Sequence, residues 1–233
     1  MLSIENLHSA YGEAHVLNGI SMQVKPGEIV AILGRNGMGK TSLVRSIMNL
    51  SFPQKVSGTV SLSGTDITKL APYKISANGL GYVPQGRRLF ESLTVLEHLK
   101  ILETTDSNAW SVERAFKEFP RLEERKFHRG NQLSGGERQM LAIARALMTG
   151  TKILLMDEPT EGLAPVMVEL VEEILKKLKN DGLGILLVEQ NFYSAMEVAD
   201  RVYIIETGNV VWEGLPVDLL QNEELQQQFL GIH

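Results

Sequence analysis

The octapeptide GRNGMGKT, residues 34–41, has the pattern G-x-x-x-x-G-K-[ST] of loops that cradle nucleotide phosphates. A strand pattern over Glu28–Leu33 runs directly into this loop. From Lys40 onward the apolar residues recur at the three- and four-residue spacing of one helix face. Strand, glycine-rich loop and helix is the context that the motif requires, so a plain glycine-rich turn is the weaker interpretation.

The chemistry of this loop comes from its backbone and from two side chains. Glycine permits close approach, so the N–H groups of residues 37–41 can point at one centre, where the helix start adds partial positive charge. Lys40 is placed to reach the β- and γ-phosphates, and the Thr41 hydroxyl is placed to ligate Mg²⁺. The predicted nucleotide-binding residues of this region are Gly34, Asn36, Gly37, Met38, Gly39, Lys40, Thr41 and Ser42.

A second element, ILLMDE at residues 153–158, is an apolar strand that ends in two carboxylates. We expect it to lie beside the phosphate loop, with Asp157 holding Mg²⁺ through water and Glu158 polarising the attacking water. Two acids at a strand end could also cap the following segment or face solvent. The presence of a phosphate loop in the same chain favours the catalytic interpretation, which predicts an ATPase.

Between these elements, residues 133–137 (LSGGE) form a glycine-rich helix start. Ser134 and Glu137 fit the S-x-x-E capping box. Helix stability does not explain Gly135 and Gly136, because a glycine inside a helix costs about 1 kcal/mol relative to alanine. Exposed N–H groups at a helix start form an anion site, and close approach to a ligand explains the glycines better. We predict that all four residues, 134–137, make a second nucleotide contact, one that could be made to another subunit.

Two further side chains have both a functional and an ordinary interpretation. Tyr11, expected in a loop after the first strand, could stack on adenine, although a lone tyrosine is more often a packing residue. Gln85 could contact Mg²⁺ or water and sense the γ-phosphate, or bond to the backbone. The five histidines show no metal-binding spacing, so solvated or structural roles are expected for His8, His15, His98, His128 and His233.

The rest of the chain predicts the domain organisation. Alternating residues at 2–7 and 20–24 are typical of half-buried antiparallel strands. Between Gln85 and Leu133 the sequence is helical in composition, at residues 95–102, 112–119 and 122–127. After residue 136, helix and strand alternate, and a hairpin is expected at residues 202–213. These patterns predict an α/β fold: a P-loop core with a mainly parallel sheet, an N-terminal antiparallel β-subdomain and an inserted helical subdomain.

Composition narrows the function classes. The 233 residues are 43% apolar with a net charge of −5, which argues for a folded core and against a general nucleic-acid binder. The absence of cysteine removes disulfides and thiolate metal sites. The N-terminus lacks a signal pattern, and no apolar run approaches the length of about 20 residues that spans a bilayer. We expect a cytoplasmic chain without direct membrane insertion that could dock on a membrane partner.

These residues resemble the ATP-binding subunit of an ABC transporter over nearly the whole chain. The resemblance implies one ABC-type ATPase domain over 1–233, with core and β-subdomain in 1–84 and 134–233 and the helical subdomain in 85–133. Residues 34–41 would be the Walker A loop, 153–158 the Walker B strand, Gln85 the Q-loop residue and Tyr11 the adenine-stacking aromatic.

The resemblance also implies a mechanism and partners. The cofactors would be ATP and Mg²⁺, with Thr41, Gln85 and Asp157 at the metal and Glu158 as catalytic base. A second ATPase subunit, a copy or a paralogue, would form a head-to-tail dimer in which residues 134–137 of one subunit cover ATP on the other. Transmembrane permease subunits would place the chain on the cytoplasmic face of the inner membrane, as a peripheral subunit.

Two departures from the family pattern indicate which branch of the family the chain resembles. Gln190 stands where the family usually has its switch histidine. Ala164 stands where the D-loop, the segment after the catalytic carboxylate, usually ends in aspartate. Glutamine can hydrogen-bond a γ-phosphate or water, so Gln190 is counted with Glu158 and Gln85 as catalytic. These segments resemble the ATPases of branched-chain amino acid importers; a urea or amide importer is the alternative, since the amino acid branch often carries glutamate at the position of Gln85. A soluble non-transport ABC ATPase is disfavoured, because the chain has neither two ATPase units nor a long coiled coil.

Overall fold

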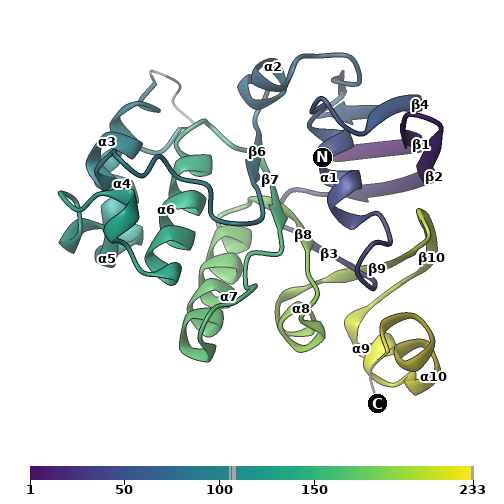
Figure 1. The fold of residues 1–233 in the computed structure, drawn as a ribbon. Coiled ribbons are helices and arrows are strands. Elements are labelled where there is room, and N and C mark those ends of the chain that lie inside the picture. The colour runs from purple at the N-terminus through teal and green to yellow at the C-terminus, as the bar shows by residue number, and fades with distance from the viewer. Residues whose placement is uncertain (105, 107–108, 232–233) are drawn as a thin grey trace.

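The computed structural model describes residues 1–104, 106 and 109–231, which form two sheets and the helices around them (Figure 1). The larger sheet has the spatial order β10 (Asn209–Gly214), β9 (Arg201–Glu206), β3 (Ile29–Leu33), β8 (Gly184–Val188), β7 (Ile153–Asp157) and β6 (Leu80–Val83). All neighbours in it are parallel except β10, which pairs antiparallel with β9 in the expected hairpin. Every residue of β3, β7 and β8 is buried, because a parallel sheet is covered on both faces.

The smaller sheet is antiparallel, as predicted for the N-terminal part of the chain. Its spatial order is β2 (Ala14–Val24), β1 (Leu2–Tyr11), β4 (Gln54–Leu62) and β5 (Thr65–Asp66). The pairing of β1 with β2 continues to the very end of the hairpin, where Tyr11 faces Ala14. Tyr11 is therefore the last residue of a strand, and its predicted place in a loop is wrong.

Alternation of side chains sorts the parallel sheet into two faces. On one face, Val30 and Ile32 of β3 pack with the antiparallel sheet and with the buried side of α1 (Lys40–Ile47). On the other face, Ala31 and Leu33 pack beneath α8 (Phe192–Val198) and α9 (Pro216–Leu220). Farther along that second face, β7 and β8 pack beneath α6 (Gly135–Leu147) and α7 (Pro165–Asn180). The α/β architecture with a mostly parallel sheet is confirmed.

Between β6 and α6 the described residues form helices and no named strand. The elements are α3 (Val95–Lys100), α4 (Val112–Glu118), α5 (Pro120–Glu124) and the 3₁₀ turn η1 (Gly130–Gln132). The last predicted helix, at residues 122–127, begins two residues earlier, because Pro120 occupies the first helical turn. His98, on α3, is buried, accepting from the Phe90 N–H at 3.0 Å and contacting the Thr94 carbonyl at 2.8 Å, a structural role; His233 lies outside the described residues.

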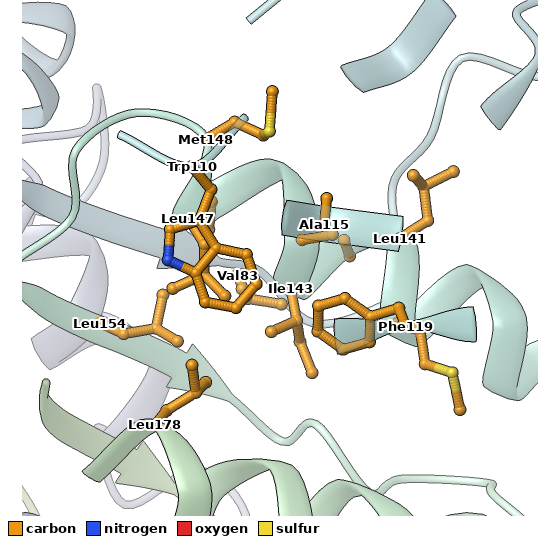
Figure 2. Close-up of a cluster of buried hydrophobic side chains, with 14 of the residues drawn as sticks. Val83, Trp110, Ala115, Phe119, Leu141, Ile143, Leu147, Met148, Leu154 and Leu178 are labelled. Carbon is orange, nitrogen blue, oxygen red and sulfur yellow. The ribbon is translucent and has the colours of Figure 1, made fainter. Parts of the chain in front are cut away.

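Figure 2 shows how this helical region is joined to the core. Trp110 and Phe119, at the two ends of α4, point into a cluster with Ile143 of α6, and their ring centroids are 6.2 Å apart. Leu154 of β7 and Leu178 of α7 belong to the same cluster. Aromatic rings bury large areas, so this contact anchors the helices to the sheet without a separate core of their own.

The remaining elements are α2 (Pro72–Ala77), which the sequence did not predict, α10 (Glu223–Leu225) and a π-helical turn, η2 (Gln226–Leu230). Among the described residues, no helix, including those described earlier, has the length and apolar character that crossing a bilayer requires.

Candidate active site

A cleft of about 300 Å³ lies where four parallel strands end. The phosphate loop follows β3, Gln190 follows β8, Glu158 follows β7, and Gln85 follows β6 (Figure 1). Ligands of open α/β sheets bind at this carboxyl edge, because the loops there converge. The lining residues are Asn36, Gly37, Gly39, Lys40, Thr41, Ser42, Gln85, Glu158, Glu161 and Gln190.

The glycines of the phosphate loop serve different purposes. Gly39 has φ +106° and caps α1 without any side-chain hydrogen bond, so the first turn of this helix is not closed by a side chain. A Cβ atom on Gly34 would lie 2.3 Å from the carbonyl oxygen of Ile205, which makes Gly34 a packing requirement of β9. Of the predicted loop residues, Gly34 and Met38 do not line the cleft; the Met38 sulfur instead accepts from the Thr207 N–H at 3.4 Å.

Lys40 is almost fully buried, at 4% exposure, and folds back on its own loop. Its Nζ donates to the carbonyl oxygens of Gly34 at 2.6 Å and Arg35 at 3.1 Å. Burial lowers the pKa of Lys40, while the charges of Glu158 and Asp157 act in the opposite direction. A phosphate oxygen would replace two neutral acceptors by a charged one, which is a stronger hydrogen-bond partner for an ammonium group.

Thr41 and Asp157 meet as the sequence predicts. The Thr41 hydroxyl donates to Oδ1 of Asp157 at 3.1 Å, across 116 residues of sequence. The other carboxylate oxygen, Oδ2, is buried and has no hydrogen-bond partner within the part of the chain that the structure describes. An orphaned carboxylate oxygen beside a hydroxyl is a donor set that Mg²⁺ prefers, so these residues fit the ion that the motif implies.

Burial raises the pKa of Asp157 to about 6, with Glu158 adding to the effect and the Thr41 hydrogen bond opposing it. The folded chain therefore binds a proton here more readily than the unfolded chain between pH 6 and pH 4. The ionised carboxylate costs up to about 3 kcal/mol at pH 7, since each pH unit is worth about 1.4 kcal/mol.

We expect the nucleotide-free Asp157→Asn variant to be more stable than the wild type at pH 7. The difference should shrink as the pH falls from 7 to 4, because the wild type becomes protonated and loses its charge. Urea unfolding of both proteins at several pH values measures this difference. A stability difference that is the same at pH 7 and pH 4.5 would contradict the raised pKa.

Gln85 joins two carboxylates at the mouth of the cleft. Its Nε2 donates to Oε2 of Glu158 at 2.9 Å and to Oε2 of Glu161 at 3.0 Å. Glu158 itself has φ +50°, and its N–H bonds to the carbonyl oxygen of Val188 at 2.9 Å, so its backbone is held at the turn. The arrangement keeps the Glu158 side chain at the cleft, with both of these hydrogen bonds donated by the amide nitrogen of Gln85.

The segment after β8 contains an exposed and a buried polar residue side by side. Gln190 is exposed and lines the cleft. Glu189 is buried and accepts from the N–H groups of Thr160 at 3.1 Å and Gln190 at 3.2 Å, while its burial raises its pKa. Glu189 thereby holds the backbone of Gln190 against the turn that follows Glu158.

Residues 134–137 do not line the cleft of the same chain. Ser134 and Glu137 form the predicted capping box: the Ser134 hydroxyl accepts from Glu137 N–H at 3.2 Å, and Glu137 accepts from Ser134 N–H at 2.8 Å. Arg125 adds an ion pair to Glu137 at 3.2 Å. A Cβ atom on Gly136 would lie 2.1 Å from Cε of Met167, so a side chain at this position would have to displace the end of that flexible methionine.

Tyr11 lies beside the cleft without lining it. Its hydroxyl is 3.3 Å from Oγ of Ser42, and the side chain is 42% exposed. Ala164, at the position of the usual D-loop aspartate, begins α7 without a side-chain cap.

Sequence reasoning missed three residues of this region. Glu161 lines the cleft, Glu189 supports Gln190, and Arg87 donates to the carbonyl oxygen of Glu161. Glu161 and Glu189 both follow strands that end at the cleft, and that position was the available signal. Nothing in the sequence near Arg87 predicts its contact with a segment 74 residues away.

Comparison with known proteins identifies the family. The family model described as "ABC transporter" matches residues 17–161. The high-affinity branched-chain amino acid transport ATP-binding protein BraG of Pseudomonas aeruginosa is 38% identical over 234 residues, covering 99% of this chain and 100% of BraG. The chain belongs to the ABC transporter family. Its predicted resemblance to that family is therefore confirmed.

Two other members show the breadth of the family. The lipopolysaccharide export system ATP-binding protein LptB of Escherichia coli K12 is 34% identical and covers 99% of this chain and 97% of LptB. The dimeric structure of MJ0796, a bacterial ABC transporter cassette, aligns with a TM-score of 0.80 at 29% identity, covering 93% of this chain and 99% of MJ0796. As an ABC transporter ATPase, the chain binds ATP, and its hydrolysis of ATP is coupled to transport.

Proposed function

We propose that this chain is the ATP-hydrolysing subunit of an importer for branched-chain amino acids. The observation that carries the proposal is the convergence of Lys40, Glu158 and Gln190 on one cleft at the carboxyl edge of the sheet. Asp157 lies behind its wall, bonded to the Thr41 hydroxyl. The 38% identity to BraG over the full length supports the substrate class, against 34% for LptB.

Phosphate binding in this cleft would use the loop and Lys40. The uncapped first turn of α1 offers backbone N–H groups, and Lys40 would exchange its two carbonyl partners for phosphate oxygens. Tyr11, next to Ser42, would stack on the adenine. Thr41, Asp157 and Gln85 would hold Mg²⁺, which supplies positive charge to the phosphate oxygens when bound.

Glu158 would act as the catalytic base toward the attacking water. Gln85 positions this carboxylate by the hydrogen bond to Oε2, and the second bond, to Glu161, fixes Gln85 in turn. Gln190 would hydrogen-bond the γ-phosphate or the water from the neighbouring strand end. The donors and the base thus approach the reacting phosphate from three different loops, the arrangement that stabilises developing charge.

A second ATPase subunit would complete the site. Residues 134–137 lie outside the cleft of their own chain, and a head-to-tail dimer would place them over ATP on the partner. In this proposal residues 85–133 form the helical subdomain that meets the permease subunits, and residues 1–84 and 134–233 form the core and β-subdomain. The chain would work as a peripheral subunit on the cytoplasmic face of the membrane.

The Gln190→His variant tests the position of the family's switch residue. We expect it to retain or exceed wild-type hydrolysis, because histidine can also hydrogen-bond the γ-phosphate and can carry a charge. The measurement is the steady-state turnover number, with ATP affinity as control. A folded, ATP-binding variant with no hydrolysis would contradict the placement of Gln190 at the phosphate.

The transport proposal is tested in proteoliposomes that contain this chain with its own permease subunits and binding protein. Uptake of leucine, isoleucine or valine that requires ATP and Mg²⁺ inside the vesicle is the expected result. Urea uptake, or ATP-driven release of lipopolysaccharide, would contradict the proposed substrate class but not the proposal that the chain hydrolyses ATP for transport. Loss of uptake with Glu158→Gln is the matched control for coupling.

A further inference from the structure

Arg87 lies where three segments that are distant in sequence come together. Its Nη2 donates to the carbonyl oxygen of Glu161, the residue that lines the cleft and bonds to Gln85. A Cβ atom on Gly135, at the first turn of α6, would lie 2.8 Å from Nη1 of the same guanidinium. Arg87 therefore contacts the wall of the cleft with one nitrogen and the start of α6 with the other.

The backbone at this point is held in an uncommon conformation. Arg87 has φ +51°, a left-handed conformation that a residue with a Cβ seldom adopts, and it follows Gly86 at φ +86°. Such strain persists only where surrounding contacts stabilise it, and it marks functional segments. The contact of the guanidinium with the Glu161 carbonyl oxygen is one such contact.

We propose that Arg87 is a positioning residue for ATP hydrolysis, which ties the Glu161–Gly162 segment to the N-terminus of α6. The inference rests on the proposed function, in which Gln85 and Glu158 act on the nucleotide of their own chain and Gly135 faces that of the partner. Arg87 does not line the cleft, so it acts through Glu161 and not on ATP directly.

Removal of the Arg87 guanidinium is expected to loosen the segment that positions the Glu158 carboxylate. Without it the Glu161 carbonyl loses a charged donor, and the space next to Gly135 opens. Glu161 then holds Gln85 less firmly, and Gln85 holds the Glu158 carboxylate. Misplacement of a catalytic group by about 1 Å can cost a hundredfold in rate, while phosphate binding by the loop of residues 34–41 stays as it was.

The experiment compares Arg87→Ala and Arg87→Lys with Arg88→Ala. Arg88 is an exposed neighbour whose side chain makes neither contact, so its variant controls for the loss of one positive charge in this loop. Hydrogen–deuterium exchange of residues 161–163 is measured on the full nucleotide-free chain. Turnover number and KM for ATP are measured on the same proteins, and thermal unfolding checks the fold.

We expect Arg87→Ala to speed exchange at residues 161–163 and to lower the turnover number about tenfold or more, with KM changed less than about twofold. Arg87→Lys should fall between wild type and Arg87→Ala, because one ammonium cannot reach both places. Exchange and turnover in Arg87→Ala equal to those in Arg88→Ala would overturn the inference. A fall in turnover matched by an equal rise in KM would also overturn it, since Arg87 would then act in binding.

A double-mutant cycle keeps the test independent of hydrolysis. Gly135→Ala puts a methyl group against Nη1, so it should displace the guanidinium and speed exchange at residues 161–163. In the Arg87→Ala background the same methyl group has nothing to displace, and the added effect should vanish. Additive effects would overturn the inference. Absence of hydrolysis in the wild type would instead contradict the proposed function and leave this cycle readable.

Discussion

Replacing Lys40 with alanine is expected to abolish measurable ATP binding. The side chain is buried at the cleft, and its Nζ donates hydrogen bonds to two carbonyl oxygens of the loop. A charge-assisted hydrogen bond to phosphate is worth up to about 3 kcal/mol, so the loss of one such bond predicts a decrease in affinity of up to about a hundredfold, and the loss of two, to the β- and γ-phosphates, predicts a larger decrease. Calorimetric titration with a non-hydrolysable ATP analogue measures this affinity.

Two controls accompany this variant: its stability toward urea, and the binding affinity of a variant at an unrelated lysine. Because burial lowers the pKa of Lys40, the charged group is disfavoured by its surroundings, and the alanine variant should fold at least as well in urea. Lys25→Ala, an exposed lysine away from the cleft, should bind the analogue as the wild type does. Normal affinity in Lys40→Ala would refute the phosphate-loop assignment.

Replacing Glu158 with glutamine is expected to separate binding from hydrolysis. Glutamine has nearly the same shape and keeps an oxygen that can accept from Gln85, but it cannot take a proton from water. Turnover should fall by about a hundredfold or more, whereas ATP affinity should change little. Glu224→Gln, on an exposed residue of α10, is the matched control.

The same variant shows whether two subunits close on ATP. With hydrolysis blocked, Glu158→Gln should accumulate as a dimer when Mg-ATP is added, and light scattering after size exclusion measures the mass. Unchanged hydrolysis would exclude Glu158 as the base. A monomer that still binds ATP would show that the second ATPase subunit is a different chain, and mixing with that paralogue should then restore the nucleotide-dependent complex.

Motifs that lie within one strand–loop–helix unit were predictable from the sequence. The phosphate loop joins β3 to α1, and the capping box of Ser134 and Glu137 opens α6, both at the predicted positions. These features depend on neighbours within a few residues, which the sequence states directly. The apolar runs at β3, β7 and β8 were equally legible, because strands covered on both faces contain almost no polar residue.

Boundaries were less accurate where long-range pairing decides them. Tyr11 is the end of a strand because β2 pairs with β1 up to the turn. No local pattern predicts how far the pairing of a hairpin extends. The contact of Gly136 with Met167 was not predictable for the same reason. The Met167 side chain that fills the space beside it comes from another helix, 31 positions later in the sequence.

Local sequence thus predicted the nucleotide chemistry, through the loop with Lys40 and Thr41 and the strand ending in Asp157 and Glu158. Only the packed sheet, with β8 between β3 and β7, brings these elements to one edge and sets Gln85 against Glu158 and Glu161. The contact of Arg87 with the Glu161 carbonyl likewise exists only after folding. The physical reason is that a motif depends on short-range backbone geometry, whereas a hydrogen bond between residues 74 positions apart depends on strand order and burial, which the whole core determines together.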